Sequence, residues 1–171
     1  MNKEDINMTK KIGILMGSDS DFPHLKGMIE ILDKFDLKYD VDVISAHRSP
    51  YKALKYAKDA KENGCGVIIA AAGGAAHLAG VIASHTTLPV IGIPMPSVLD
   101  GLDSLLSTVQ MPKGVPVATV AIGSTGAVNA GVLACQILAV SDDALSRKLA
   151  DYKIELAEKV DQASEKVKKI L

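Results

Sequence analysis

Three short polar segments carry most of the residue types that could perform chemistry in this chain. Residues 17–21 read Gly-Ser-Asp-Ser-Asp, residues 45–50 read Ser-Ala-His-Arg-Ser-Pro, and residues 72–78 read Ala-Gly-Gly-Ala-Ala-His-Leu. The second and third segments hold two of the four histidines. An imidazole beside a guanidinium, hydroxyls beside carboxylates and a glycine pair suit a small anionic ligand that exchanges protons.

The first segment has the composition of a phosphate and sugar site. Ser18 and the free N–H groups of a helix start suit a phosphate, and the carboxylate of Asp21 suits sugar hydroxyls. The plain alternative is a helix N-cap in which these side chains satisfy only the first turn. The segment lacks both the Gly-x-x-x-x-Gly-Lys pattern of a Walker loop and the Gly-x-Gly-x-x-Gly pattern of a dinucleotide loop.

The second and third segments supply a cation and two imidazoles. Arg48 can bind a phosphate with two parallel hydrogen bonds, and His47 can take up and release a proton near neutral pH. Gly73 and Gly74 would let a ligand approach the backbone closely, which favours a ligand-facing His77 over a core histidine bonded to backbone. His24 and His85 lie in helix-like segments and are expected to be structural or to lie at the surface.

Composition excludes several other classes of protein. The 171 residues carry 19 basic and 20 acidic side chains, which predicts neither a nucleic-acid nor a membrane surface. The histidines and the two cysteines are too sparse for a metal site, so we expect no metal and no cofactor. Cys65 and Cys135 fit reduced, buried thiols, and residues 1–10 fit a flexible, polar N-terminus without a signal-peptide core. A cytoplasmic protein fits all of this.

Each of the three polar segments follows a predicted strand. The strands are expected at residues 11–16, 39–45, 67–72, 89–93 and 116–122, with helices at 22–35 and 51–63 and after the glycine pair. Such alternation predicts one α/β domain over residues 1–171, with a parallel sheet between two layers of helices. Ligands of these sheets bind at the carboxyl ends of the strands, which would gather the three segments into one site.

Two segments point beyond a monomer. Residues 126–139 hold only Asn129 and Gln136 as polar residues, so a helix there needs covering on all sides. Residues 142–171 predict one long helix, capped by Ser141, with a single apolar stripe made of Leu145, Leu149, Tyr152, Leu156, Val160, Ala163, Val167 and Ile170. Either this helix packs on its own domain or it reaches a neighbouring subunit.

The three segments, in order, resemble the N5-carboxyaminoimidazole ribonucleotide mutases, class I of the PurE family. So do the stretches 103–105, 109–112, 121–123 and 129–130, and the resemblance runs from about residue 11 to 171. It implies a flavodoxin-like three-layer sandwich, a homo-octamer with sites at subunit contacts, and an isomerase of purine biosynthesis. The implied reaction moves a carboxyl group from the exocyclic nitrogen to C4 of an imidazole ribonucleotide.

The resemblance also implies a role for each site residue. His47 matches the proton-shuttling histidine and Arg48 the phosphate-binding arginine. The remaining substrate-binding positions match Ser18, Asp21, Ser45, Gly73, Gly74 and His77. Ala79, Ser124-Thr125 and a shorter loop at 96–100 depart from the usual mutase pattern and concern loop contacts.

Two alternative functions remain open at this point. One is a carboxylase of the same fold that takes CO2 directly, although such enzymes carry Lys where Arg48 stands and lack the Gly-Gly-Ala-Ala-His loop. The other is a non-catalytic flavodoxin-like nucleotide-binding module. A receiver-type module would place a lysine after the fifth strand, where this chain has Gly123-Ser124-Thr125.

Overall fold

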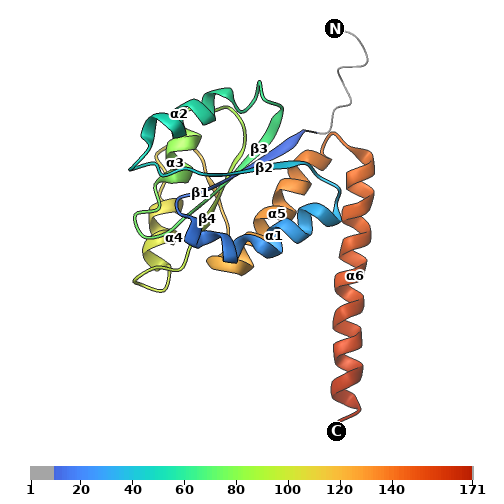
Figure 1. Cartoon of the computed structure of the whole chain (residues 1–171). Helices are drawn as coiled ribbons and strands as arrows, with labels where there is room; N and C mark the ends of the chain where they lie inside the picture. Colours follow the sequence, from blue (N-terminus) through green and yellow to red (C-terminus); the bar gives the residue numbers. More distant parts are fainter. Residues whose placement is uncertain (1–9, 171) are drawn as a thin grey trace, which may run out of the picture.

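A five-stranded, all-parallel sheet forms the centre of the molecule (Figure 1). The computed structural model describes residues 10–170. The strands are β1 (Lys11–Met16), β2 (Tyr39–Val43), β3 (Cys65–Ala72), β4 (Val90–Pro94) and β5 (Ala118–Thr119), in the spatial order β2-β1-β3-β4-β5. This is the flavodoxin-like strand order, and it confirms the predicted fold class.

Helices cover both faces of the sheet. One face carries α1 (Phe22–Lys34) and α5 (Gly123–Ala139), and the other carries α2 (Pro50–Asp59), α3 (Leu78–Ala83) and α4 (Leu102–Val109). A short 3-10 turn, η2 (Asp19–Asp21), leads into α1, and the long α6 (Asp143–Lys168) follows α5. Every residue of β3 is buried, and its side chains alternate between the two faces, so that Ile69 packs toward α1 and α5 while Ile68 packs toward α2 and α3.

The predicted elements differ from the structure at the sheet edges. The strand expected at 116–122 is reduced to the two residues of β5, which pair only with Ile91 and Gly92. At the other edge, Val41 and Val43 are 43% and 45% exposed instead of facing the core. Helix α4 is a further difference, because no helix is predicted there from the sequence. An edge strand is supported on one side only, so its length and burial depend on partners outside the local sequence.

The two cysteines are free and buried, as predicted. Burial raises the pKa of the Cys135 thiol to about 12 and also raises that of Cys65. Both therefore stay protonated and act as small apolar side chains.

The long helix α6 packs on its own domain only near its beginning. Its cap is Asp142, whose carboxylate accepts from the N–H groups of Ala144 and Leu145, and not Ser141 as predicted. Tyr152 stands edge-on to Phe35 with ring centroids 5.6 Å apart, and Lys34 forms an ion pair with Glu155. Beyond this point α6 extends away from the body (Figure 1).

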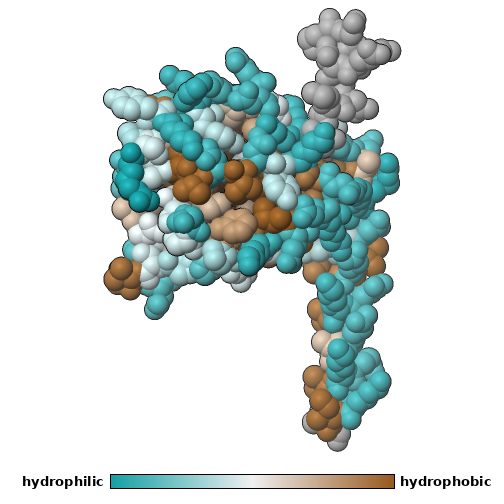
Figure 2. Space-filling model, in the orientation of Figure 1, coloured by the Kyte–Doolittle hydropathy of each residue, from teal (hydrophilic) through white to brown (hydrophobic). Residues whose placement is uncertain are grey.

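The projecting part of α6 exposes its apolar stripe. Val160, Val167 and Ile170 are 68%, 58% and 84% exposed. Figure 2 shows the apolar side chains along this arm and a second apolar patch over the region of β2. Among the described residues, no helix combines the length and the apolar character needed to cross a bilayer. The predicted flexible N-terminus lies outside the described residues, apart from Lys10.

Candidate functional site

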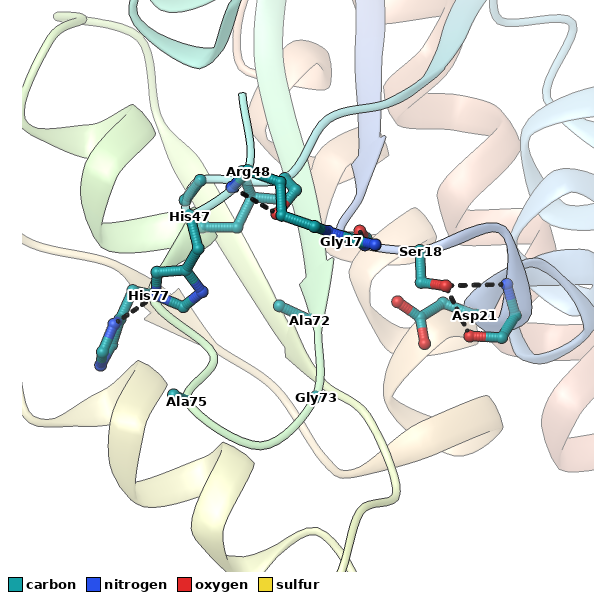
Figure 3. Close-up of a pocket in the computed structure, with 13 residues that line it drawn as sticks. Gly17, Ser18, Asp21, His47, Arg48, Ala72, Gly73, Ala75 and His77 are labelled. Carbon is teal, nitrogen blue, oxygen red and sulfur yellow. Dashed lines mark hydrogen bonds between the residues drawn. The ribbon is translucent and has the colours of Figure 1, made fainter. Parts of the chain in front are cut away.

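The three polar segments, residues 17–21, 45–50 and 72–78, meet at the carboxyl ends of β1, β2 and β3. They enclose a cavity of about 410 Å³ at the point where the strand order reverses, between β1 and β3 (Figure 3). The structure brings seven of the eight predicted site residues to its wall: Ser18, Asp21, Ser45, His47, Arg48, Gly73 and His77. Gly74 does not line it.

The first loop presents hydroxyls and one half-buried carboxylate. Ser18 Oγ caps η2 by accepting from Ser20 N at 3.3 Å, and Ser20 Oγ lies 2.8 Å from it. Burial raises the pKa of Asp21 above its usual value, opposed by hydrogen bonding at Ser18 and by the charge of His24. Ser20, which is not among the predicted site residues, also lines the cavity. Its place between Ser18 and Asp21 in the sequence could have marked it as a site residue.

The second loop aims Arg48 across the first. The Nη2 group of Arg48 donates to Gly17 O at 3.2 Å, and its backbone N–H donates to Ser45 Oγ at 3.1 Å. In Figure 3 the Arg48 side chain runs from its own loop toward Gly17 and Ser18. Ser45 therefore holds Arg48 in place, and the guanidinium keeps further N–H donors for a ligand.

The two predicted imidazoles form a pair. His47 Nε2 lies 2.9 Å from His77 Nδ1, and the rings meet edge-on with centroids 5.1 Å apart. One of these two nitrogens donates the proton of the bond and the other accepts it, so the bond ties the tautomer of one ring to that of the other. Nδ1 of His47 is left for a ligand. Both side chains are exposed in the single chain.

The third loop forms an uncharged wall. Ala72, Gly73 and Ala75 line the cavity, and Ala76 is buried behind them. Gly74 adopts φ +64°, a left-handed conformation that strains any residue with a side chain. His77 ends this loop directly before α3. Small side chains and backbone thus form the part of the cavity wall that leads to His77.

His24 does not line the cavity. His24 Nδ1 lies 3.2 Å from Ser124 Oγ, so a residue that departs from the usual mutase pattern contacts a histidine that was expected to be structural or to lie at the surface. Among the described residues, no cluster of three or more His, Cys, Asp or Glu side chains could hold a metal ion.

Comparison with known proteins places the chain in a family. The model of the family described as AIR carboxylase matches residues 11–159. The chain belongs to this family. N5-carboxyaminoimidazole ribonucleotide mutase of Thermotoga maritima is 51% identical over 161 residues, covering 94% of this chain and 93% of that protein. The protein of the same name from Bacillus subtilis is 52% identical, covering 94% and 99%.

A solved structure of the family has the same architecture. The crystal structure of Treponema denticola PurE superposes with a TM-score of 0.82 at 26% identity, covering 92% of this chain and 98% of that one. The resemblance drawn from the loops is confirmed. The relatives that share about 50% of their residues with this chain are named as mutases.

Proposed function

We propose that this chain is an N5-carboxyaminoimidazole ribonucleotide mutase, an isomerase of purine biosynthesis. The observation that carries the proposal is the agreement between near-full-length relatives of that name and a cavity in which Arg48, His47 and an uncharged glycine loop converge. The substrate is an imidazole ribonucleotide with a carboxylate on its exocyclic nitrogen. The product carries that carboxylate on C4.

The first two loops hold the ribose phosphate. Arg48 and the hydroxyls of Ser18 and Ser20 face the same part of the cavity and offer charged and neutral donors to phosphate oxygens. Asp21, in the same loop, accepts from the ribose hydroxyls. Binding at this end holds the imidazole ring of the substrate beside the histidine pair, so the free energy of phosphate binding contributes to orienting the reacting atoms.

His47 moves the proton that the reaction requires. The N–C bond of the carbamate breaks, CO2 leaves, and the nitrogen takes a proton from His47. The enamine carbon C4 then attacks CO2, and His47 removes the C4 proton. Protons balance over the cycle, so one general acid–base group is sufficient, and His77 at 2.9 Å orients its ring.

The third loop keeps CO2 beside the substrate. CO2 is small and uncharged, so a wall of backbone and alanine methyl groups can hold it, and exclusion of water prevents its escape and hydration. Ala72, Gly73 and Ala75 supply such a wall.

Substrate choice tests the proposal. Purified enzyme is assayed for the C4-carboxylated product with the N-carboxylated ribonucleotide, and separately with aminoimidazole ribonucleotide plus bicarbonate. A mutase turns over the first far faster. Faster product formation from free bicarbonate would favour the carboxylase alternative, and no product from either would favour a binding module. The His47→Asn enzyme is the control for turnover outside the site.

We also propose a homo-octamer, located in the cytoplasm, in which α6 lies on a neighbouring subunit. The exposed stripe of Val160, Val167 and Ile170 supports this, since burial of each such side chain contributes about 1.5–3 kcal/mol. The exposure of His47 and His77 gives a second reason, because a neighbour covering the cavity would exclude water. The reduced cysteines suit the compartment.

Charge placed on the stripe tests the assembly. Val160→Asp with Val167→Asp changes side chains that are exposed in the single chain, so the fold should persist while light scattering shows dissociation and activity falls. Gln162→Asp puts one negative charge on the opposite side of α6 and should leave the octamer intact, as the single variants Val160→Asp and Val167→Asp should not. An octamer retained by the double variant would refute the role of the stripe.

A further inference from the structure

Two serine side chains of helix α4 form hydrogen bonds with the backbone of Gly74. Its N–H donates to Ser104 Oγ at 2.8 Å, and its carbonyl accepts from Ser107 Oγ at 3.2 Å. Ser104 is completely buried, and α4 follows the loop by about 30 residues in the chain. Both polar groups of one loop residue are therefore bound by side chains one helical turn apart.

The two serines contribute unequally. A hydroxyl has a single proton, and Ser107 Oγ also donates to Asp103 O at 2.8 Å, so its bond to Gly74 is shared. Gly74 O already accepts from Ala76 N at 2.8 Å. Gly74 N, in contrast, has Ser104 Oγ as its acceptor, and losing that acceptor would leave a part-buried N–H unpaired. Ser104 is the main support.

The position of Gly74 matters because of its neighbours. Gly73 and Ala75 on either side line the cavity, and His77 follows three residues later with its ring on His47. A shift of Gly74 would move this wall and the second imidazole together. The phosphate end, at Arg48 and Ser18, belongs to other loops and would stay in place.

We propose that Ser104, supported by Ser107, is a positioning residue that keeps the 73–77 loop closed on CO2 during the reaction. This inference rests on the proposed mutase function. If the loop opens after the carbamate bond breaks, CO2 leaves the site while the proton from His47 stays on the nitrogen. The products are then CO2 and free aminoimidazole ribonucleotide, and no C4–carboxyl bond forms.

The test is the partition between the two products. Ser104→Ala and wild-type enzymes are given the N-carboxylated ribonucleotide, and C4-carboxylated and decarboxylated ribonucleotides are quantified, with decarboxylation in the absence of enzyme subtracted. A misplaced wall should lower kcat roughly 10- to 100-fold. KM should remain within about twofold because the phosphate contacts are unchanged. The share of decarboxylated product should rise severalfold.

Thr108→Val is the matched control. Thr108 is buried on the same helix, but its hydroxyl donates to the helix carbonyl of Ser104 at 2.8 Å. This variant should keep the wild-type partition even if its melting temperature falls. Ser107→Ala should raise the decarboxylated share less than Ser104→Ala, and it serves as the test if Ser104→Ala does not fold.

Two results would overturn the role. One is an unchanged partition in Ser104→Ala, whatever happens to kcat, and in the fallback case an unchanged partition in Ser107→Ala. The other is an equal rise in Thr108→Val, which would reflect general loosening of α4. A wild-type enzyme that forms no C4-carboxylated product would instead contradict the mutase function itself.

Discussion

Replacing Arg48 by alanine should weaken ribonucleotide binding specifically through the phosphate. In the structure the guanidinium makes two long contacts, 3.2 Å to Gly17 O and 3.4 Å to Ser45 Oγ. Its remaining donors are available for a phosphate. Hydrogen bonds to charged groups contribute about 1.5–3 kcal/mol. Because Arg48 is exposed in the single chain, solvent screening keeps the expected total near 2–3 kcal/mol.

That free energy corresponds to a Kd roughly 30- to 150-fold higher, at 1.4 kcal/mol for each factor of ten. Calorimetry with the C4-carboxylated ribonucleotide measures it, and the dephosphorylated nucleoside is the control ligand. The nucleoside should bind wild type and Arg48→Ala alike. Arg48→Lys keeps the charge but loses the fork, so it should fall between the two. Equal weakening for nucleoside and nucleotide would show that Arg48 does not bind the phosphate.

Three further predictions concern the proton, the half-buried carboxylate and the packing of α5. His47→Asn should retain ribonucleotide binding while kcat falls about 10²- to 10⁴-fold; turnover within tenfold of wild type would rule out His47 as the general acid–base group. The raised pKa of Asp21 means that its contribution to stability is present below its usual value of 3.8 and is lost as pH rises through the folded pKa. The melting temperature of Asp21→Asn minus that of wild type should therefore increase from pH 4 to pH 7. A difference that does not change with pH would contradict the raised pKa of Asp21 as its cause. In α5, a Cβ at Gly126 would lie 1.6 Å from Ala121 O, so Gly126→Ala should lower the free energy of unfolding by about 3 kcal/mol. At Gly131 a Cβ would come no closer than 3.2 Å to any atom. Denaturation of Gly131→Ala should therefore show a clearly smaller loss in the free energy of unfolding.

The sequence predicted where the three loops lie because strand ends are local features. The strand Lys11–Met16 appears in the structure with the predicted bounds, and β3 differs only at its start. Once the sheet is parallel, the loops that follow β1, β2 and β3 must meet at one edge. This is why Ser18, His47 and His77 could be grouped without any knowledge of their distances.

The supports behind the site were missed because they depend on contacts distant in sequence. Helix α4 left a readable signal, since Leu102, Leu105, Leu106 and Val109 follow a helical period. The periodicity could have predicted the helix. It could not have shown that Ser104 meets Gly74, because that contact depends on how α4 packs beside β4. The exposure of Val41 and Val43 is similar, since it depends on what covers an edge strand.

The source of the transferred carboxyl group tests the central claim most directly. The enzyme is given N-carboxylated ribonucleotide with ¹³C in the carbamate, in a large excess of unlabelled bicarbonate, and the product is analysed by mass spectrometry. A mutase that holds CO2 behind the 73–77 loop predicts that the C4 carboxylate keeps the ¹³C label. Product that carries mainly unlabelled carbon would show that the carboxyl group comes from solution and would contradict the account.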